Sequence, residues 1–239
     1  MAAEAIAAGD VEVGGVPALK PATLVDENAS VRLRRAARRY VSRGGIKLEA
    51  ALSAFEVNVL QRRALDVGAS TGGFTDCLLA KGATSVVALD VGYGQFDWAL
   101  RNDERVTVVE RTNFRYADPA VLGAPFDVVV ADLSFISLRT VAKQLRAAGT
   151  EGTDYVLLVK PQFEVGRGAV GRGGIVRDAS LHGAAIENVA RALDDAGVGM
   201  RGAVASPLVG AKGNREFLIW GRPGTRTLDM LQIDEVTKQ

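Results

Sequence analysis

Residues 65 to 80 read LDVGASTGGFTDCLLA, and this stretch contains a change from strand to helix. The apolar residues before Gly68 are typical of a buried strand, whereas FTDCLLA is typical of a helix. Glycines at 68, 72 and 73 permit positive φ angles and let backbone N–H groups approach a ligand closely. The N-terminus of the following helix favours a carboxylate or a phosphate. The stretch therefore predicts a ligand-binding turn between a strand and a helix.

The spacing of this turn is DxGxxxGG, which differs from the GxGxxG spacing of dinucleotide-binding folds. A dinucleotide fold stays open, but the observed spacing suits a smaller ligand that lies beside the turn, such as the methionine part of S-adenosylmethionine. The candidate cofactor contacts around the turn are Asp66, Gly68, Ala69, Ser70, Gly72 and Phe74.

From residue 64 onward, short apolar runs alternate with helical patterns, which is typical of a parallel sheet flanked by helices. We expect the last two strands, which follow a helix over residues 179–197, to form an antiparallel, hairpin-like pair at the sheet edge. The sequence thus predicts an α/β, Rossmann-like fold with a seven-stranded, mostly parallel sheet. The predicted strands cover residues 64–68, 85–90, 106–110, 126–131, 154–160, 202–208 and 215–221.

The pattern differs before residue 45. Residues 1–33 contain a short Ala-rich helical stretch and then small strands separated by Gly, Pro and Asn turns, and they are too few to bury a core of their own. Residues 34–45 form a basic linker, with a helix expected over residues 46–55. Residues 46–223 are the predicted main domain, and residues 224–239 are a predicted C-terminal tail.

The composition excludes several classes of protein. The 239 residues carry a formal net charge of +1, so a polyanion site has to come from local charge asymmetry. The single cysteine, Cys77, excludes an internal disulfide and fits a reducing compartment, and the single histidine, His182, disfavours a His-based metal site or a Ser-His-Asp triad. No apolar run is long enough for a membrane span and no signal peptide is evident, so we expect a cytoplasmic protein with no metal.

Two polar residues follow the next two predicted strands. Asp90 ends the second strand, where an acid in doubly wound folds binds the ribose hydroxyls of a nucleoside cofactor. Alone, such an acid is more often a turn or capping residue, but the glycine turn upstream favours the cofactor interpretation. Asn113, just past the third strand, is placed to meet the adenine or simply forms a loop, and the sequence does not decide between these.

Charged residues also mark the ends of later strands, where ligands of open parallel sheets bind. Asp132 ends the fourth strand and Lys160 ends the fifth, in YVLLVKPQFE. Lys47 begins the helix before the first strand, and Glu216 opens the last strand. Two roles are open to Lys160: its ammonium extends into water at a strand end, or its amine serves as a base toward a sugar hydroxyl. The sequence does not decide its protonation state, because the two carboxylates favour the charged form whereas the second lysine and partial burial favour the neutral form. The DLSF sequence at Asp132 lacks the Pro-Pro-aromatic motif of amino-group methyltransferases.

Many ordered motifs resemble one family over about residues 1 to 221: SRGGIKLEAAL, DVGASTGGFTD, ALDVGYGQ, RNDERV, ERTN, DLSFIS, LVKPQFEVGRG and GNREFLIW. They are similar to the TlyA, or hemolysin A, family of FtsJ-like rRNA 2'-O-methyltransferases. The resemblance implies a class I S-adenosylmethionine-dependent enzyme whose substrate is a cytidine ribose 2'-hydroxyl of large-subunit rRNA and, for some members, of small-subunit rRNA. It also implies a catalytic tetrad of Lys47, Asp132, Lys160 and Glu216, with Asp132 at the cofactor as well.

The same resemblance implies a partial N-terminal alpha-L, S4-like RNA-binding domain, because residues 5 to 33 match only the later part of that module. Ribosomal RNA would be the partner, and RNA is recognised mainly through its shape, phosphates and 2'-hydroxyls. Two basic segments are candidate RNA contacts. The first is either an RNA contact or a solvated helix face. The second is either a mobile lid that contacts RNA and closes over the cofactor or a passive surface loop. Their residues are Arg34, Arg35, Arg38, Arg39 and Arg43, and Arg167 and Arg172 in GRGAVGRGGIVRD.

Four other residues have simpler expected roles. Phe135 and Phe163, just beyond two strand ends, stack on a base or wall the pocket. His182 is expected on a helix surface, and Cys77 in the core. A ribosome-binding assembly factor without catalysis and, remotely, a membrane-active haemolysin are the alternative functions. The modified nucleotide, the choice of subunit and the oligomeric state are left open by the sequence.

Overall fold

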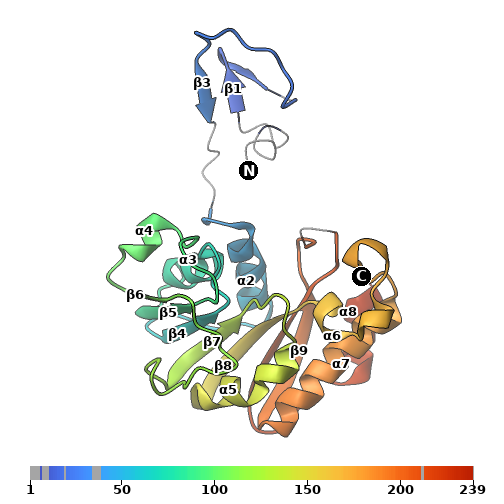
Figure 1. Ribbon diagram of the computed structural model, residues 1–239. Helices are drawn as coiled ribbons and strands as arrows, with labels where there is room; N and C mark the ends of the chain where they lie inside the picture. Colours follow the sequence, from blue (N-terminus) through green and yellow to red (C-terminus); the bar gives the residue numbers. More distant parts are fainter. Residues whose placement is uncertain (1–5, 7–10, 19, 34–38, 211–212, 239) are drawn as a thin grey trace. The chain divides into compact units, whose positions relative to one another are not determined.

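The computed structural model describes the chain except residues 1–5, 7–10, 19, 34–38, 211–212 and 239 (Figure 1). The chain divides into two compact units, Met1–Arg39 and Tyr40–Gln239. The division falls inside the predicted linker, residues 34–45. Each unit is described below by itself.

The first unit contains a small antiparallel sheet of strands β1 (Val11–Val13), β2 (Val16–Pro17) and β3 (Val31–Leu33), in the order β2-β1-β3. Two glycines with positive φ, at 14 and 15, make the turn between β1 and β2. The small strands expected in residues 1–33 are thus confirmed. Most of the Ala-rich stretch before them lies outside the described residues, and the S4-like assignment stays a prediction.

The second unit contains, within the described residues, a seven-stranded sheet in the order β6-β5-β4-β7-β8-β10-β9. Strand pairing is parallel from β6 to β8, and β10 is antiparallel to both of its neighbours. The α/β class and the antiparallel pair at the sheet edge are therefore confirmed. The strands are β4 (Arg63–Val67), β5 (Ser85–Leu89), β6 (Val106–Val109), β7 (Phe126–Ala131), β8 (Gly149–Val159), β9 (Val198–Ala205) and β10 (Phe217–Pro223).

Helices cover both faces of this sheet (Figure 1). The residues of α2 and α3 share a core cluster with one face, and those of α5, α7 and α8 share a cluster with the other. The α-helices are α2 (Arg43–Ala54), α3 (Gly73–Ala80), α4 (Trp98–Arg101), α5 (Ala142–Ala147), α6 (Pro161–Glu164), α7 (Ala179–Asp195) and α8 (Met230–Lys238), and the 3-10 helices are η1 (Leu138–Val141), η2 (Arg167–Ala169) and η3 (Arg172–Gly174).

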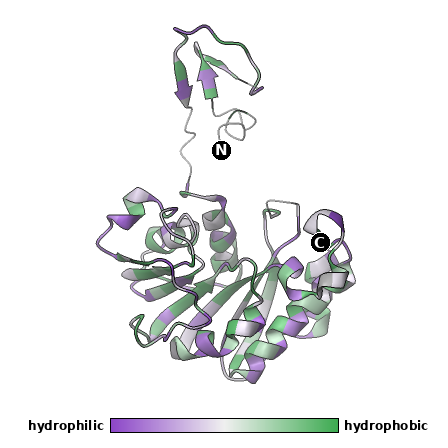
Figure 2. Cartoon of the chain, in the orientation of Figure 1, coloured by the Kyte–Doolittle hydropathy of each residue, from purple (hydrophilic) through white to green (hydrophobic). Residues whose placement is uncertain are grey.

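Strand β8 shows why the sheet is buried on both sides. Tyr155, Leu157 and Val159 join one core cluster, whereas Val156 and Leu158 join the other, as the two-residue period of a strand requires. Each such side chain contributes about 1.5–3 kcal/mol on full burial. Figure 2 shows the same apolar character along the sheet strands. The run from Tyr155 to Val159 is therefore apolar on both faces of the sheet.

Two strands begin earlier than the sequence predicts. The first residues of β8, from Gly149, are polar and partly exposed, so they show no apolar pattern. Strand β9 begins at Val198 and not at residue 202. A glycine such as Gly199 is typical of a loop in the sequence, but in the structure its lack of a side chain lets the backbone of Gly224 approach the strand. A Cβ there would lie 2.3 Å from the Gly224 carbonyl oxygen.

Two expectations about single residues have different outcomes. Cys77 lies in the core, as expected. His182 is not on the helix surface, because it is 2% exposed, its Nε2 lies 2.9 Å from the Val176 carbonyl oxygen, and its ring contacts Phe217.

Residues after 223, expected as a tail, include α8, whose Ile233 is fully buried in the core.

Candidate active site

Polar groups gather at the carboxyl ends of four parallel strands. Gly68 follows β4, Asp90 follows β5, Asp132 follows β7 and Lys160 follows β8. All four line cavities at this edge of the sheet. The β4 and β7 ends lie so close that a Cβ on Gly68, whose φ is +88°, would be 2.5 Å from the Asp132 carbonyl oxygen. Glycine at 68 is thus required by the close approach and by the backbone angle.

The glycine turn is tied to the end of the neighbouring strand. The N–H groups of Gly68 and Ala69 donate to the Leu89 carbonyl oxygen at 2.8 and 3.0 Å. Ser70 N–H donates to Asp90 Oδ2 at 2.8 Å, and Gly92 N–H donates to Asp90 Oδ1 at 2.6 Å. Asp90 therefore fixes the turn while its carboxylate remains on the cavity wall.

The first cavity has a volume of about 560 Å3 and lies along the ends of β5, β6 and β7. Asp90 and Asn113 line it, together with apolar groups such as Phe114 and Leu133. Asn113 Oδ1 accepts a hydrogen bond from Arg115 N–H at 3.0 Å. Asn113 thus forms a local turn and also lines the first cavity, and its contact with an adenine stays a prediction.

The second cavity, of about 350 Å3, contains the four charged residues of the predicted tetrad: Lys47, Asp132, Lys160 and Glu216. Lys47 Nζ donates to Glu216 Oε2 at 2.5 Å. Lys160 Nζ forms an ion pair with Asp132 Oδ1 and donates to Ser134 Oγ at 3.0 Å. The side chains of Lys47 and Lys160 are only 10% and 11% exposed, so these contacts are partly shielded from solvent.

Two packing features bring the tetrad together. Ser42 caps α2 by accepting a hydrogen bond from Gly44 N–H, which fixes the first turn, just before Lys47. The antiparallel register pairs Phe217 of β10 with Val159 of β8. Glu216, one residue before Phe217, therefore lies at the same edge as Lys160, one residue after Val159.

Sequence reasoning missed two residues next to the tetrad. Ser134 touches the Lys160 ammonium, and its place in DLSF, two residues after Asp132, was the available signal. Gly210 leaves the room that the Glu216 carboxylate occupies, because a Cβ there would lie 2.4 Å from Glu216 Oε1. No local pattern marks Gly210, since the contact depends on how the loop before β10 folds back.

A third cavity, also about 350 Å3, adjoins the other two. It shares Lys160 and Glu216 with the second cavity, and Ser134 and Phe135 with the first. Phe135 is 91% exposed and has a left-handed φ of +65°, which is unusual for a bulky residue. Its ring centroid lies 5.3 Å from that of Phe163, at a tilt of 50°. Three cavities therefore meet at the charged residues.

Comparison with known proteins identifies the architecture. The model of the FtsJ-like methyltransferase family matches residues 40–223. The chain belongs to this family. It is 52% identical to the 16S/23S rRNA (cytidine-2'-O)-methyltransferase TlyA of Mycobacterium tuberculosis, over 94% of this chain and 84% of that protein. It is 47% identical to the putative rRNA methyltransferase YqxC of Bacillus subtilis, over 84% of this chain and 72% of that protein.

A solved structure agrees with this assignment. A putative hemolysin from Streptococcus thermophilus superposes with a TM-score of 0.85 at 40% identity, covering all of this chain and 88% of that one. The FtsJ-like match begins at Tyr40, where the second structural unit also begins. The cavities described above therefore lie within the methyltransferase unit.

Not every predicted cofactor contact reaches a cavity of this methyltransferase. Gly68, Ala69, Ser70 and Phe74 line the second cavity. Asp66 and Gly72 do not occur among the described lining residues of the three cavities. Gly72, with φ at +96°, shapes the start of α3 instead.

Asp66 is fully buried beneath the glycine turn of the methyltransferase. Its Oδ2 accepts a hydrogen bond from Thr75 Oγ1 at 2.7 Å, whereas Oδ1 has no hydrogen-bond partner among the described residues. Burial raises the pKa of Asp66 to about 7, with the hydrogen bond from Thr75 opposing and the nearby Asp132 reinforcing the shift. Asp66 thus supports the turn from below and does not face the cavity.

The predicted RNA contacts are placed unevenly. Arg43 lines the second cavity of the methyltransferase, and Arg172 lies in η3, on the Gly-rich segment that borders the third cavity. Arg39 is exposed in the first unit. Arg34, Arg35 and Arg38 lie outside the described residues, as does the side chain of Arg167.

Metal-binding groups and membrane-spanning helices are both absent from the described part of the chain. No group of His, Cys, Asp and Glu side chains there could hold a metal ion. No helix there is long and apolar enough to cross a membrane.

Proposed function

We propose that this protein transfers a methyl group from S-adenosylmethionine to the ribose 2'-hydroxyl of a cytidine in large-subunit ribosomal RNA, with small-subunit ribosomal RNA as a second candidate substrate. The observation that carries the proposal is that the second cavity, which the tetrad lines, shares Asp132 with the first cavity and shares Lys160 and Glu216 with the third. The names of the M. tuberculosis and B. subtilis relatives support the reaction and the RNA substrate.

The residues of the first two cavities fit S-adenosylmethionine. The first cavity has the apolar walls that an adenine needs and, at Asp90, a carboxylate that can accept hydrogen bonds from ribose hydroxyls. The second runs along Gly68 and Ser70, where the methionine part would lie beside the turn. When bound, this cofactor supplies an electrophilic methyl group carried on a sulfonium.

Lys160 is the group that we assign to the proton of the 2'-hydroxyl. In its neutral form the Nζ atom can accept that proton as the hydroxyl oxygen gains the methyl group. Asp132 and Ser134, which already contact Nζ, then hold the resulting ammonium in place. Lys47 and Glu216 line the same cavity, and their mutual contact would fix both side chains near the ribose.

The third cavity suits the target nucleoside. It contains Phe135 and Phe163, aromatic rings on which a base can stack once it has left its neighbours in the RNA. It opens onto Lys160 and Glu216, where the ribose would lie. Arg43 and Arg172, at the second cavity and beside the third, would contact the RNA backbone.

The test is methyl transfer from tritiated S-adenosylmethionine to unmethylated ribosomal subunits, with Lys160→Ala in parallel and separate counting of each rRNA. We expect 2'-O-methylcytidine from the wild-type chain and about 10²- to 10⁴-fold less label from the variant, the usual range for loss of a general base. Cofactor binding without transfer would instead support a ribosome-binding assembly factor. Normal turnover by Lys160→Ala would overturn the assigned role of this lysine.

A further inference from the structure

Two carboxamide side chains line the third cavity, and they differ in what they contact. Asn214 is 3% exposed and both of its polar atoms are engaged. Its Nδ2 donates to the Gly174 carbonyl oxygen at 2.8 Å, and its Oδ1 accepts from Val176 N–H at 2.9 Å. Asn214 therefore fastens the Gly-rich segment to the loop before β10 and has little capacity left for a ligand.

Gln162 is the contrasting case. Its carboxamide makes no hydrogen bond with any residue that the structure describes, and its Oε1 atom is shielded from solvent. An unsatisfied buried acceptor costs free energy, and water cannot offset that cost at a shielded atom. Gln162 also lines the third cavity, so a turn of its terminal torsion presents the unpaired amide to a ligand bound there.

The backbone that carries Gln162 is held on both sides. Lys160, two residues earlier, pairs with Asp132. Glu164, two residues later, accepts hydrogen bonds from Ser137 Oγ at 2.5 Å and from Leu138 N–H at 2.8 Å. The backbone at Gln162 is thus held, and a half-turn of its terminal torsion, whose preferences are broad and roughly two-fold, exchanges the two ends of the amide.

The chemistry of the cavity narrows the ligand. A carboxamide offers one acceptor and one donor side by side, and a cytosine edge offers the complementary 4-amino donor and N3 acceptor. The phenyl rings of Phe135 and Phe163 supply apolar surface for the face of the same base. Of the other polar residues that line this cavity, Asn214 is engaged by the backbone, Ser134 accepts from the Lys160 ammonium, and Lys160 and Glu216 belong to the tetrad.

We propose that Gln162 reads the target base: its Oε1 accepts a hydrogen bond from the 4-amino group of cytosine, and its Nε2 donates to N3. This inference rests on the proposed function and adds a specificity-determining residue to it. The pair selects a pyrimidine that carries an amine and holds its ribose toward Lys160. Gln162 takes no part in the proton transfer.

The test is a double-mutant cycle between the side chain and the base. Subunits are assembled with rRNA whose target cytidine, mapped first with the wild-type chain, is replaced by a pyrimidin-2-one nucleotide that lacks the 4-amino group. We expect wild-type kcat/KM to fall about 10-fold on this RNA, because N3 remains but the hydrogen bond to the 4-amino group is lost and Gln162 Oε1 is left unpaired. Gln162→Met has a side chain of similar length that cannot form these hydrogen bonds, so its kcat/KM values on the two RNAs should agree within about 2-fold.

Controls separate base reading from folding. Gln162→Met should bind S-adenosylmethionine with the wild-type Kd, and Gln162→Glu, which keeps an acceptor for the amine, should retain part of the preference. Asn214→Ala should lower the unfolding temperature but keep the wild-type ratio between the two RNAs. If folded Gln162→Met kept the wild-type ratio of kcat/KM between the two RNAs, this inference would be overturned and the proposed function would stand. A wild-type chain that labels neither RNA would overturn the proposed function and this inference with it.

Discussion

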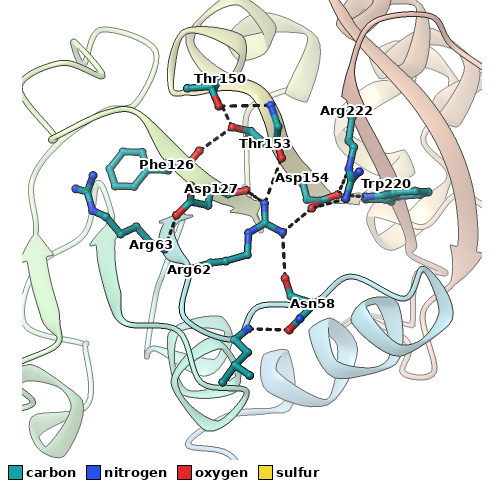
Figure 3. A network of polar contacts seen from close by, with 12 residues as sticks. Asn58, Arg62, Arg63, Phe126, Asp127, Thr150, Thr153, Asp154, Trp220 and Arg222 are labelled. Atoms are coloured by element: carbon teal, nitrogen blue, oxygen red, sulfur yellow. Dashed lines mark hydrogen bonds and ion pairs between the residues drawn. The ribbon is translucent and has the colours of Figure 1, made fainter.

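Two charged residues of strand β8 and its end differ in how completely their charges are satisfied. Asp154, fully buried near the middle of the strand, accepts hydrogen bonds from Arg62, Trp220 and Arg222 at 2.6 to 3.1 Å (Figure 3). Lys160, just after the carboxyl end of the strand, contacts Asp132 and Ser134 on the wall of two cavities.

The difference separates a structural cluster from a reactive one. Both oxygens of Asp154 are occupied by donors from β10 and from the residue before β4, so the cluster joins strands and leaves no site for a ligand. In the tetrad, Asp132 Oδ1 is buried with no partner besides the Lys160 ammonium among the described residues. Charged groups that keep unused capacity beside a cavity are the ones available for chemistry.

Asp66 is a third carboxylate, and it differs from the other two in how it makes stability depend on pH. The pKa of Asp66 is about 7 in the folded chain against 3.8 in its ordinary range, because burial outweighs its one hydrogen bond. Between these pH values the folded chain holds a proton that the unfolded chain has released. The stability from this group is thus full below pH 3.8 and lost as pH rises through 7, by about 4 kcal/mol.

We expect Asp66→Asn to remove this loss. Urea unfolding between pH 5 and pH 8 would show a smaller decline of unfolding free energy with pH in the variant than in the wild type. Parallel pH dependences of the two proteins would contradict the raised pKa.

Asp154→Asn should have the next largest effect. Although burial opposes it, hydrogen bonds from Arg222, Arg62 and Trp220 lower the pKa of Asp154, so its contribution is present at neutral pH and lost in acid. Removal of the charge leaves two arginines without their partner and should cost about 3 kcal/mol in urea unfolding at pH 7. Methyl transfer per folded molecule should stay near wild type, and a large loss of turnover would give this cluster a catalytic role.

Gly210→Ala tests the reactive end without removing a charge. The new Cβ would lie 2.4 Å from Glu216 Oε1 and force that carboxylate to move. We expect about 10- to 100-fold slower methyl transfer, since displacement by about 1 Å can cost this much. Gly152→Ala is the matched control, because no heavy atom lies within 4 Å of its new Cβ. Equal rates for the two variants would show that the position of Glu216 is not critical.

The smallest effect is expected at the surface. Arg105 and Asp103 form an exposed ion pair at 2.7 Å, and hydrogen bonds from Arg105 lower the pKa of Asp103 to about 2. Solvent screens such a pair, so Arg105→Ala should change the unfolding free energy by at most about 1 kcal/mol. If Arg105→Ala lowered the unfolding free energy as much as Asp154→Asn, burial would not be the reason why the two ion-pair sites differ.

The sequence alone determined the α/β class, the glycine turn and the residues that follow each parallel strand. These features depend on local patterns: apolar runs, glycines at a turn, and the rule that ligands bind where parallel strands end. Asp90, Asp132 and Lys160 could be found for this reason, since each directly follows an apolar run. The motif resemblance then supplied the tetrad and the family.

Only the tertiary structure decided which groups touch. Lys47 and Glu216 are 169 residues apart, and their contact depends on the antiparallel register of β10 against β8. The space at Gly210, the burial of His182 and the unpaired amide of Gln162 depend likewise on loops that fold back onto the sheet. Local patterns carry no information on such long-range packing, because each contact is set by elements distant in the chain.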